Sequence, residues 1–449
     1  MTDTKSPITL YIAPLVIPVT GPMICNGAVA VRDGHILHVG TEEWMTNKLH
    51  EELGEGLPGC EVLHWDGLIT PGLVNAHTHL QYTGMAPVGK NHYDSFRAWE
   101  LAFNAIYDDP APKPWRTWAH EGARQLVESG TTAAADIVSD VEAADALRSQ
   151  GLHGITYWEV MDWNNEDWMR SGTDTLLANI KHLRDCGITE LGISPHAPYS
   201  LGSGPLLDLP DIARRLGMRL HIHLGETPAE AGAVPSRLTS LTSWAWNHRE
   251  WRSFNDLKRA GTGASAIQFL DQLAVLGPDV HIAHGVHASR EDRRILRQRG
   301  VSVALCPRSN RITCTMGDAP IARYLEEGNL LAVGTDSLSS CPSLDVLDDV
   351  AFLYDLAIDQ GYEDEDLSHR LIRMVTLGGA ESMGLNSGSK RIGQINVGAS
   401  ADLAFFDIAV DVSSPQALEA TLREFIRHGS GTCRATIIEG RISHDRIWA

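Results

Sequence analysis

Two histidines, His77 and His79, stand at the end of an apolar stretch that runs from Gly67 to Ala76. In a β-strand, side chains two positions apart point to the same face, so both imidazoles would leave the strand end together. Histidine nitrogen is a common ligand of Zn²⁺, and a pair held in this way suits a metal site. The spacing therefore predicts that His77 and His79 bind a metal ion.

Polar side chains also follow other predicted strands. The candidates at the strand ends are His196, His223, Glu226, His284, Arg308 and Asp336. Because the carboxyl ends of barrel strands meet at one face, we expect these side chains to converge. His77, His79 and His223 with Asp336 make a Zn²⁺ shell that leaves room for a water if the ion is five-coordinate. His221 shares a face with His223 but lies one layer deeper, which favours a buried histidine behind the ligands.

Glu226 and His284 are the expected acid and base groups. Glu226 lies three residues beyond His223, which favours a proton shuttle tuned by the metal and by a semi-enclosed pocket over a solvated loop carboxylate. His284 is either a further ligand or a hydrogen-bonding partner of the metal's water. We favour the second, since four ligands already fill the shell. None of the seven lysines falls at a predicted strand end, so no lysine bridges two ions and one metal is expected.

The elements that must position these residues form the pattern of an α/β protein. Between residues 68 and 385, short apolar runs alternate with longer helical stretches, as in βα units around a parallel sheet. Eight strands are predicted: Leu68–Ala76, Thr132–Ile137, Gly154–Trp158, Glu190–Ser194, Arg219–His223, Val280–Ala283, Val301–Leu305 and Leu331–Val333. This number indicates a closed (β/α)8 TIM barrel.

The two ends of the chain have a different texture. Residues 1–67 and 386–449 contain short strands with tight turns, among them a predicted hairpin around Asp33 and Gly34. We expect these two segments to pair into one small composite β-sandwich domain beside a barrel domain of residues 68–385.

Composition and charge limit the classes of partner. A 449-residue chain with 43% hydrophobic and 21% charged residues is typical of a globular protein of more than one domain. The formal net charge of −20 argues against nucleic-acid and anionic-membrane partners, which require basic surfaces, and leaves a small-molecule substrate. Seven scattered cysteines without a C-x-x-C motif indicate a reducing compartment, and we expect the cytoplasm. A homodimer or a higher homo-oligomer stays open.

Five segments together resemble the amidohydrolase superfamily, in its mononuclear-metal deaminase and chlorohydrolase branch. They occur in the family's order over essentially the whole chain: Pro71–Leu80, Ser194–Tyr199, His221–Thr227, Ala283–Gly285 and Gly334–Ser337. The resemblance extends to the flanking β domain through Gly393, Gly398 and the Ala401-Asp402-Leu403 triplet.

The resemblance implies a mechanism. His77, His79, His223 and Asp336 would hold one Zn²⁺, or Fe²⁺ as in some relatives, which lowers the pKa of a bound water toward about 7. His284 and Asp336 would orient that water and take its proton. Glu226 would protonate a ring nitrogen while the adjacent amine-bearing carbon is attacked. The implied reaction is hydrolytic deamination of an amino-purine nucleoside or a related aromatic heterocycle, which breaks a C–N bond other than a peptide bond and releases ammonia.

Three residues are candidate substrate contacts. Gln81 would hydrogen-bond a heterocycle edge, unless it is an ordinary polar loop residue. His196 matches the histidine that similar nucleoside-type deaminases use on the substrate. Arg308, in Cys306-Pro307-Arg308-Ser309-Asn310, is either a bidentate partner for a planar anion or part of an internal ion pair. This motif resembles deaminases of aminodeoxyfutalosine, whose benzoate would pair with the arginine, more than the adenosylhomocysteine and methylthioadenosine deaminases. Asn91, His92 and Tyr93 stand where those relatives carry a carboxylate for the ribose.

Two clusters of tryptophans and one long connection each have two possible interpretations. The clusters either wall a pocket or, as we favour, pack helices or an oligomer contact: Trp158, Trp163 and Trp168, then Trp244, Trp246 and Trp251. The connection of residues 227–262 is expected to form a helical lid or an interface. Alternative functions are hydrolytic dechlorination, opening of a cyclic amide or amidine at the same metal site, and, remotely, a non-catalytic scaffold barrel.

Overall fold

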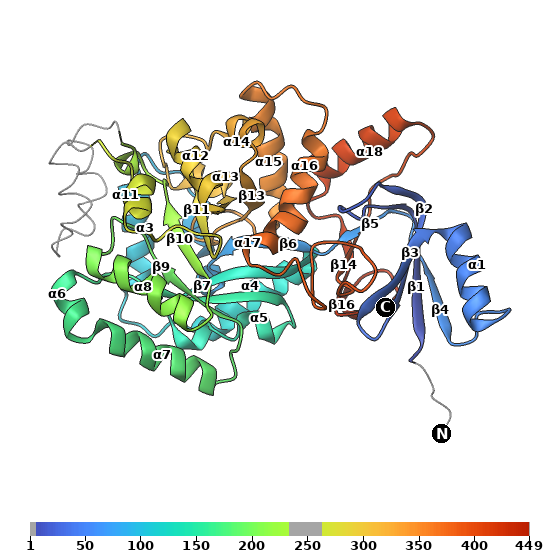
Figure 1. The fold of residues 1–449 in the computed structure, drawn as a ribbon, viewed down its shortest axis with the longest axis horizontal. Helices are drawn as coiled ribbons and strands as arrows, with labels where there is room; N and C mark the ends of the chain where they lie inside the picture. Colours follow the sequence, from blue (N-terminus) through green and yellow to red (C-terminus); the bar gives the residue numbers. More distant parts are fainter. Residues whose placement is uncertain (1–5, 233–262, 449) are drawn as a thin grey trace.

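The computed structural model describes residues 6–232 and 263–448, and it contains a parallel β-barrel beside a second, mixed sheet (Figure 1). The barrel strands are hydrogen-bonded in sequence order from β6 to β13, and β13 returns to contact β6. Their bounds are β6 Leu73–Thr78, β7 Thr131–Val138, β8 His153–Val160, β9 Leu191–Pro195, β10 Leu220–Leu224, β11 Val280–His284, β12 Ser302–Leu305 and β13 Leu330–Val333. This arrangement confirms the predicted TIM barrel.

The first predicted strand, Leu68–Ala76, is wrong as a single element. Its first part is β5 (Leu68–Pro71), which pairs with strands of the second sheet, and only its second part is the barrel strand β6. The chain passes from one sheet to the other at Gly72, where a Cβ atom would lie 2.1 Å from the Thr132 hydroxyl oxygen. Pro71 has no N–H to extend the ladder, so a break after it is physically expected.

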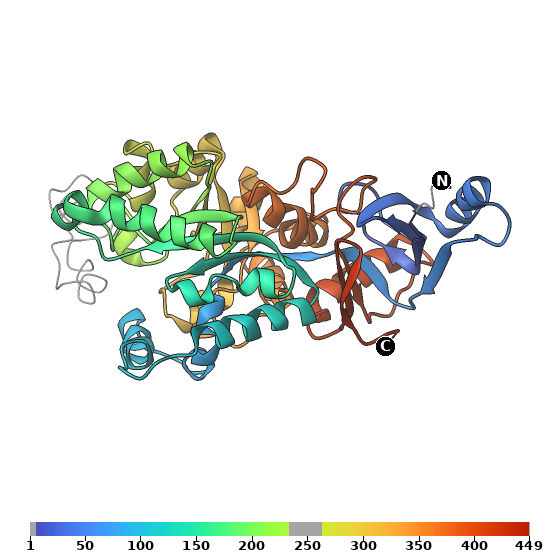
Figure 2. The same ribbon diagram turned by 90° about the horizontal axis from the view of Figure 1, so that it is seen from below.

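Helices surround the barrel, and the longer ones follow the strands as in βα units (Figures 1 and 2). Those between the first and fifth barrel strands are α2 Ala86–Gly89, α3 Phe96–Tyr107, α4 Trp115–Glu128, α5 Ala146–Ser149, α6 Asn165–Asp167, α7 Thr173–Asp185 and α8 Ser203–Arg215. Those after the fifth barrel strand are α11 Ala266–Gln272, α12 Arg290–Arg299, α13 Pro307–Ile312, α14 Ile321–Glu327, α15 Val346–Asp359, α16 Leu367–Arg373 and α17 Gly379–Ser382. The buried faces of the longer helices join the barrel strands in one large apolar core.

Both ends of the chain build the second sheet, which lies at one end of the elongated molecule (Figure 2). Its strands are β1 Ile8–Val16, β2 Ile24–Arg32, β3 His35–Thr41, β4 Cys60–His64, β5, β14 Leu403–Phe406, β15 Cys433–Ile438 and β16 Arg441–Asp445, and helix α1 Glu42–Leu53 follows β3. Helix α18 Pro415–His428 lies between β14 and β15 in the chain and packs against α15 and α16. The predicted hairpin is present as β2 and β3, and left-handed backbone at Asp33 and Gly34 forms its turn. The sheet has its own apolar core, in which Tyr11 packs edge-on against Phe405.

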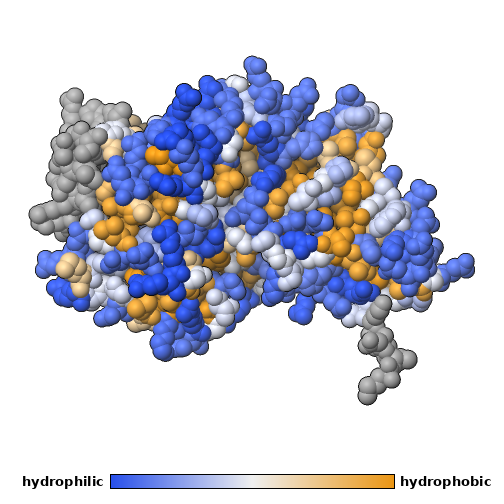
Figure 3. Space-filling view, in the orientation of Figure 1, coloured by the Kyte–Doolittle hydropathy of each residue, from blue (hydrophilic) through white to orange (hydrophobic). Residues whose placement is uncertain are grey.

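The face of the molecule in Figure 3 is mainly hydrophilic, in agreement with the content of charged residues. Hydrophilic residues cover most of the face shown in Figure 3, and hydrophobic residues show between them in smaller areas. Within the described ranges, no helix is both long and apolar enough to span a membrane.

The first tryptophan cluster packs in the protein interior. Trp158 and Trp168 belong to the barrel core, Trp163 packs against that core, and Trp168 donates a hydrogen bond to Asp208 at 2.8 Å. None of the three lines the cavity at the carboxyl ends of the strands. The second cluster, Trp244, Trp246 and Trp251, and most of the predicted lid of residues 227–262 lie outside the described residues.

Candidate metal centre and active site

Four side chains from three barrel strands meet at one point, as the sequence predicts for the ligands. His77 is the last residue but one of β6, His79 follows that strand, His223 is near the end of β10, and Asp336 follows β13. Asp336 has a left-handed backbone with φ of 64°, a conformation that costs free energy and recurs at functional sites. The Asp336 N–H donates to the His77 carbonyl at 2.9 Å, so the first and last strands hold each other where the ligands emerge.

The distances between the ligand atoms match a single metal ion. His77 Nε2 and His79 Nε2 lie 3.6 Å and 3.7 Å from Asp336 Oδ1, and His79 Nε2 lies 3.2 Å from His223 Nε2. Ligand atoms about 2.0–2.2 Å from a shared Zn²⁺ lie roughly 3.3–3.6 Å apart in a tetrahedral shell. One nitrogen or oxygen of each residue therefore faces a common point.

The chemical state of these imidazoles also fits a metal. Burial lowers the pKa of His77, His79 and His223, that of His79 to about 4, which keeps the rings neutral and able to coordinate. His223 Nδ1 lies 3.0 Å from the His196 carbonyl, which orients Nε2 toward the centre. The buried His77 Nε2 has no hydrogen-bond partner among the described residues, as expected of an atom that binds an ion.

His221 lies behind the ligands, as the sequence indicates. It is fully buried, and its Nε2 is 2.6 Å from His77 Nδ1. This contact fixes the orientation of the His77 ring and directs its other nitrogen toward Asp336, in the manner of the outer hydrogen-bonding partners found at many metal sites.

Glu226 and His284 lie together beside the ligands. Glu226 is 5% exposed, accepts a hydrogen bond from the Tyr199 hydroxyl at 2.8 Å, and places Oε1 3.7 Å from His284 Nε2. Burial raises the pKa of Glu226. Asn310 Oδ1 lies 2.9 Å from His284 Nδ1 and thereby leaves Nε2 directed toward the site. The pair thus offers a proton donor and a proton acceptor in one pocket.

His284 also comes close to the metal ligands themselves. One nitrogen each from His77, His223 and His284 lie within 4.8 Å of one another. His284 also has a left-handed backbone, with φ of 75°, at the last position of β11. Both interpretations of the sequence, a further ligand or a partner of the metal's water, stay compatible with this position.

Sequence reasoning missed three side chains that hold these groups. Tyr199 bonds Glu226, Asn310 bonds His284, and Ser309 donates to Asp336 Oδ2 at 2.7 Å. All three belong to the conspicuous Ser194–Tyr199 and Cys306–Asn310 segments. Their polar side chains, in the same segments as candidate site residues, were the available sequence signal.

Of the three predicted substrate contacts, His196 alone lines the cavity at the strand ends. Its ring lies 4.8 Å from that of His223, and its Nδ1 lies 2.7 Å from the Ser200 hydroxyl.

Gln81 does not line this cavity. Its Nε2 donates to the Ser139 hydroxyl at 2.7 Å, and its Oε1 accepts from the Ser139 N–H at 2.9 Å. Both ends of the amide are used, so Gln81 ties the 3₁₀ helix Leu80–Met85 to the residue after β7. The geometry supports the structural role, and the heterocycle contact stays a prediction.

Arg308 does not line the cavity either, and its contact with a substrate anion stays a prediction. The guanidinium donates to Asp349 at 2.7 Å and to Asp348 at 3.0 Å, and Asp349 is completely buried. Arg308 lies in the first turn of α13, and its guanidinium bonds two aspartates of α15. Of the two interpretations left open by the sequence, the structure favours the internal ion pair.

We expect Arg308→Met to lower the free energy of unfolding by about 3–5 kcal/mol, because it leaves Asp349 buried without its partner. Urea titration measures this loss. The double variant Arg308→Met, Asp349→Asn should regain part of it. The KM of the folded fraction should stay within about twofold, because Arg308 does not line the cavity. A stable Arg308→Met with a strongly raised KM would contradict this account.

The strand-end cavity, of about 300 Å³, has an aromatic wall that the sequence analysis did not identify. Phe96, Trp99, Phe103 and Tyr107 recur along one face of α3, and successive rings lie 5.3–5.6 Å apart. Their spacing of three and four residues was a readable helical signal. The lining also includes Glu159, the strand-end carboxyl of β8, whose position could likewise be read from the sequence.

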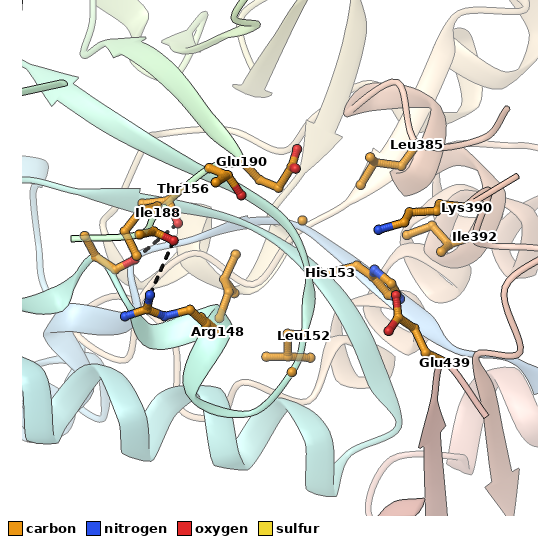
Figure 4. A pocket seen from close by; sticks show the side chains of 16 residues that line it. Arg148, Leu152, His153, Thr156, Ile188, Glu190, Leu385, Lys390, Ile392 and Glu439 are labelled. Carbon is orange, nitrogen blue, oxygen red and sulfur yellow. Dashed lines mark hydrogen bonds between the residues drawn. The ribbon is translucent and has the colours of Figure 1, made fainter. Parts of the chain in front are cut away.

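A second cavity, of about 340 Å³, opens at the other end of the barrel beside the second sheet. Figure 4 shows His153, at the start of β8, next to Glu439, with Lys390 and Ile392 across from Arg148. None of the predicted site residues lines this cavity. The chemistry-bearing side chains therefore gather at the carboxyl ends of the strands, as in other TIM barrels.

Comparison with known proteins agrees with this arrangement. The Amidohydrolase family signature matches residues 68–443. The chain belongs to the amidohydrolase family. A 5-methylthioadenosine/S-adenosylhomocysteine deaminase of Syntrophobacter fumaroxidans is 28% identical over 435 residues, which cover 94% of this amidohydrolase and 87% of the relative.

Solved structures confirm the fold of the amidohydrolase. An adenosine deaminase from Xanthomonas campestris with bound zinc superposes with a TM-score of 0.77 at 22% identity, covering 98% of this chain and 94% of that one. An aminofutalosine deaminase of Helicobacter pylori, in complex with methylthio-coformycin, gives a TM-score of 0.73 at 20% identity, with 97% and 99% covered. These similarities extend over both the barrel and the second sheet.

Proposed function

We propose that this amidohydrolase removes an amino group by hydrolysis from an adenosine-type nucleoside and releases ammonia. One observation carries the proposal. The buried Glu226 carboxyl lies 3.7 Å from His284 Nε2, beside three neutral imidazoles and a carboxylate whose ligand atoms face one point. Deamination of a heterocycle requires a nucleophile generated near neutral pH and a proton donor for the ring. The proposed metal site would supply the nucleophile, and Glu226 would supply the proton.

His77, His79, His223 and Asp336 would hold one Zn²⁺, with Fe²⁺ as the alternative. Either ion supplies the Lewis acidity that makes water a nucleophile near neutral pH. Three nitrogen donors with one oxygen donor suit both ions, and the deaminase of Xanthomonas campestris contains zinc.

The protein's own side chains would move the protons. His284 Nε2 and Asp336, which lie beside the ligand nitrogens, would take a proton from the attacking water and return it to the amino group, which leaves as ammonia. Glu226, whose pKa is raised by burial, would give its proton to the ring nitrogen next to the amine-bearing carbon. Tyr199 would hold the Glu226 carboxyl in place through its 2.8 Å hydrogen bond. His196, on the cavity wall, would contact the nucleoside.

The substrate is proposed at the level of the nucleoside class. The names of the relatives described above indicate action on methylthioadenosine, adenosylhomocysteine, adenosine and aminofutalosine. The sequence favours an aminodeoxyfutalosine-like substrate through Arg308, whose guanidinium forms an ion pair with Asp349. We also propose that the enzyme works in the cytoplasm, since all seven cysteines are free thiols. Its oligomeric state, a monomer or a homo-oligomer, can be measured by light scattering.

A screen for ammonia release tests the proposed function. We expect release from at least one of adenosine, 5′-deoxyadenosine, methylthioadenosine, adenosylhomocysteine and aminodeoxyfutalosine. Guanine, a pterin, a chlorinated triazine and a cyclic amide serve as comparison substrates. Chloride or carboxylate release without ammonia would establish one of the alternative hydrolytic reactions instead. The absence of every product from zinc-loaded and iron-loaded protein would contradict the hydrolase assignment.

A further inference from the structure

The active-site cavity is lined by several carboxyl groups that the proposed reaction does not use. Glu100, Asp108, Glu159 and Asp162 line this cavity together with Glu226 and Asp336. No lysine or arginine among the described residues lines it. The ionised forms of these carboxyls attract positive charge and repel anions. Burial raises the pKa of Glu159 to about 8 and that of Glu100 to about 7, and a cation bound beside them favours the ionised form.

Glu159 is a buried member of this set, and one of its carboxyl oxygens lacks a partner among the described groups. It is 8% exposed, and its Oε1 has no hydrogen-bond partner among the described side chains and backbone groups. One of its oxygens lies within 4.8 Å of ring nitrogens of His196 and His223, so the carboxyl reaches the centre of the cavity. A buried polar atom left without a partner is destabilising, and a ligand group that donates to it removes the penalty.

An aromatic surface lies next to this carboxyl. The aromatic rings of α3 and the Tyr82 ring line the same cavity, and Tyr82 meets Phe103 edge-on at 5.1 Å. Aromatic faces attract cations, and aromatic rings combined with carboxylates are a common way to bind ammonium groups.

We propose that this cavity binds a protonated amine of the substrate between Glu159 and the aromatic face of α3. The proposal rests on the proposed function and narrows its substrate class to adenosine-type nucleosides with a cationic substituent away from the amino group that is removed. Asp108 and Asp162, which line the same cavity, add to the attraction for positive charge.

Three nucleosides that differ only at the 5′ position test this inference: one with an amine, adenosine with its hydroxyl, and one with a carboxylate. At a pH where the amine is protonated, kcat/KM for the amine should exceed that for adenosine by about tenfold. The carboxylate compound should be poorer than adenosine. Glu159→Gln, which keeps the shape of the side chain, should raise KM for the amine by about tenfold and change KM for adenosine less than about twofold. Glu166→Gln, an exposed carboxyl after the same strand, is the matched control.

Calorimetric binding of the three nucleosides to the metal-loaded protein separates the inference from the proposed function. If no nucleoside is deaminated but the amine binds more tightly than adenosine, and Glu159→Gln removes the difference, the function fails and the inference stands. If all three are deaminated equally and Glu159→Gln changes nothing, the inference fails and the function stands. Equal losses for the amine and for adenosine would show a neutral hydrogen bond to the nucleoside and would also overturn it.

Discussion

Glu226→Gln should lower kcat for ammonia release by about 10²- to 10⁴-fold with little change in bound metal, because an amide cannot deliver the proton that the ring nitrogen needs. The substitution preserves the size of the side chain and its ability to accept the hydrogen bond from Tyr199. KM should change less than kcat, since the loss occurs in the transition state. Steady-state ammonia release on a verified substrate, with the metal content measured on the same sample, gives both values.

Tyr199→Phe is the matched control for this prediction. It removes the hydrogen bond to Glu226 Oε2 but leaves the carboxyl itself, so its effect on kcat should be clearly smaller than that of Glu226→Gln. If Glu226→Gln retains full activity, the carboxyl is not the proton donor and the role assigned to it must be abandoned.

Removal of the metal should abolish ammonia release, and one equivalent of Zn²⁺ or Fe²⁺ per chain should restore it. Without the ion, the attacking water keeps its bulk pKa, and too little hydroxide forms at neutral pH. Elemental analysis before and after chelation gives the stoichiometry. His223→Ala should fail to recover activity, because it deletes a ligand whose Nε2 lies 3.2 Å from His79 Nε2.

His369→Ala provides the control, since His369 pairs with Glu419 on the surface and lies outside the cavity. It should bind the same amount of metal as the unaltered protein. Two tightly bound ions per chain would contradict the single-metal site. Full activity in protein shown to contain no metal would remove the metal from the mechanism.

The strand-end residues could be predicted from the sequence because the geometry of a parallel barrel is strict. Once β6, β10 and β13 are recognised as barrel strands, residues at or just past their ends must meet, and His77, His223 and Asp336 follow without knowledge of any side-chain direction. The same reasoning failed for Leu68–Ala76, because a continuous apolar run does not reveal that its two halves pair with different sheets.

Residues on the connections could not be placed in this way. Arg308 begins a helix, and its partner Asp349 is 41 residues further along the chain, so strand periodicity says nothing about its direction. Gln81 lies in a 3₁₀ helix and bonds Ser139 from another connection. The aromatic face of α3 and Glu159 are different, because the helical spacing of the rings and the strand-end position of the carboxyl can both be read from the order of the residues.

The contact between the first and last barrel strands affects when the site can form. Asn75 and Thr335 are 260 residues apart and join side chain to side chain at 2.8 Å, next to His77 and Asp336. During synthesis, His77 and His79 emerge long before Asp336, whose carboxylate completes the set of candidate ligands. The full ligand set therefore exists only when the barrel has closed, and tight metal binding is expected to be a late event in maturation that stabilises the closed ring.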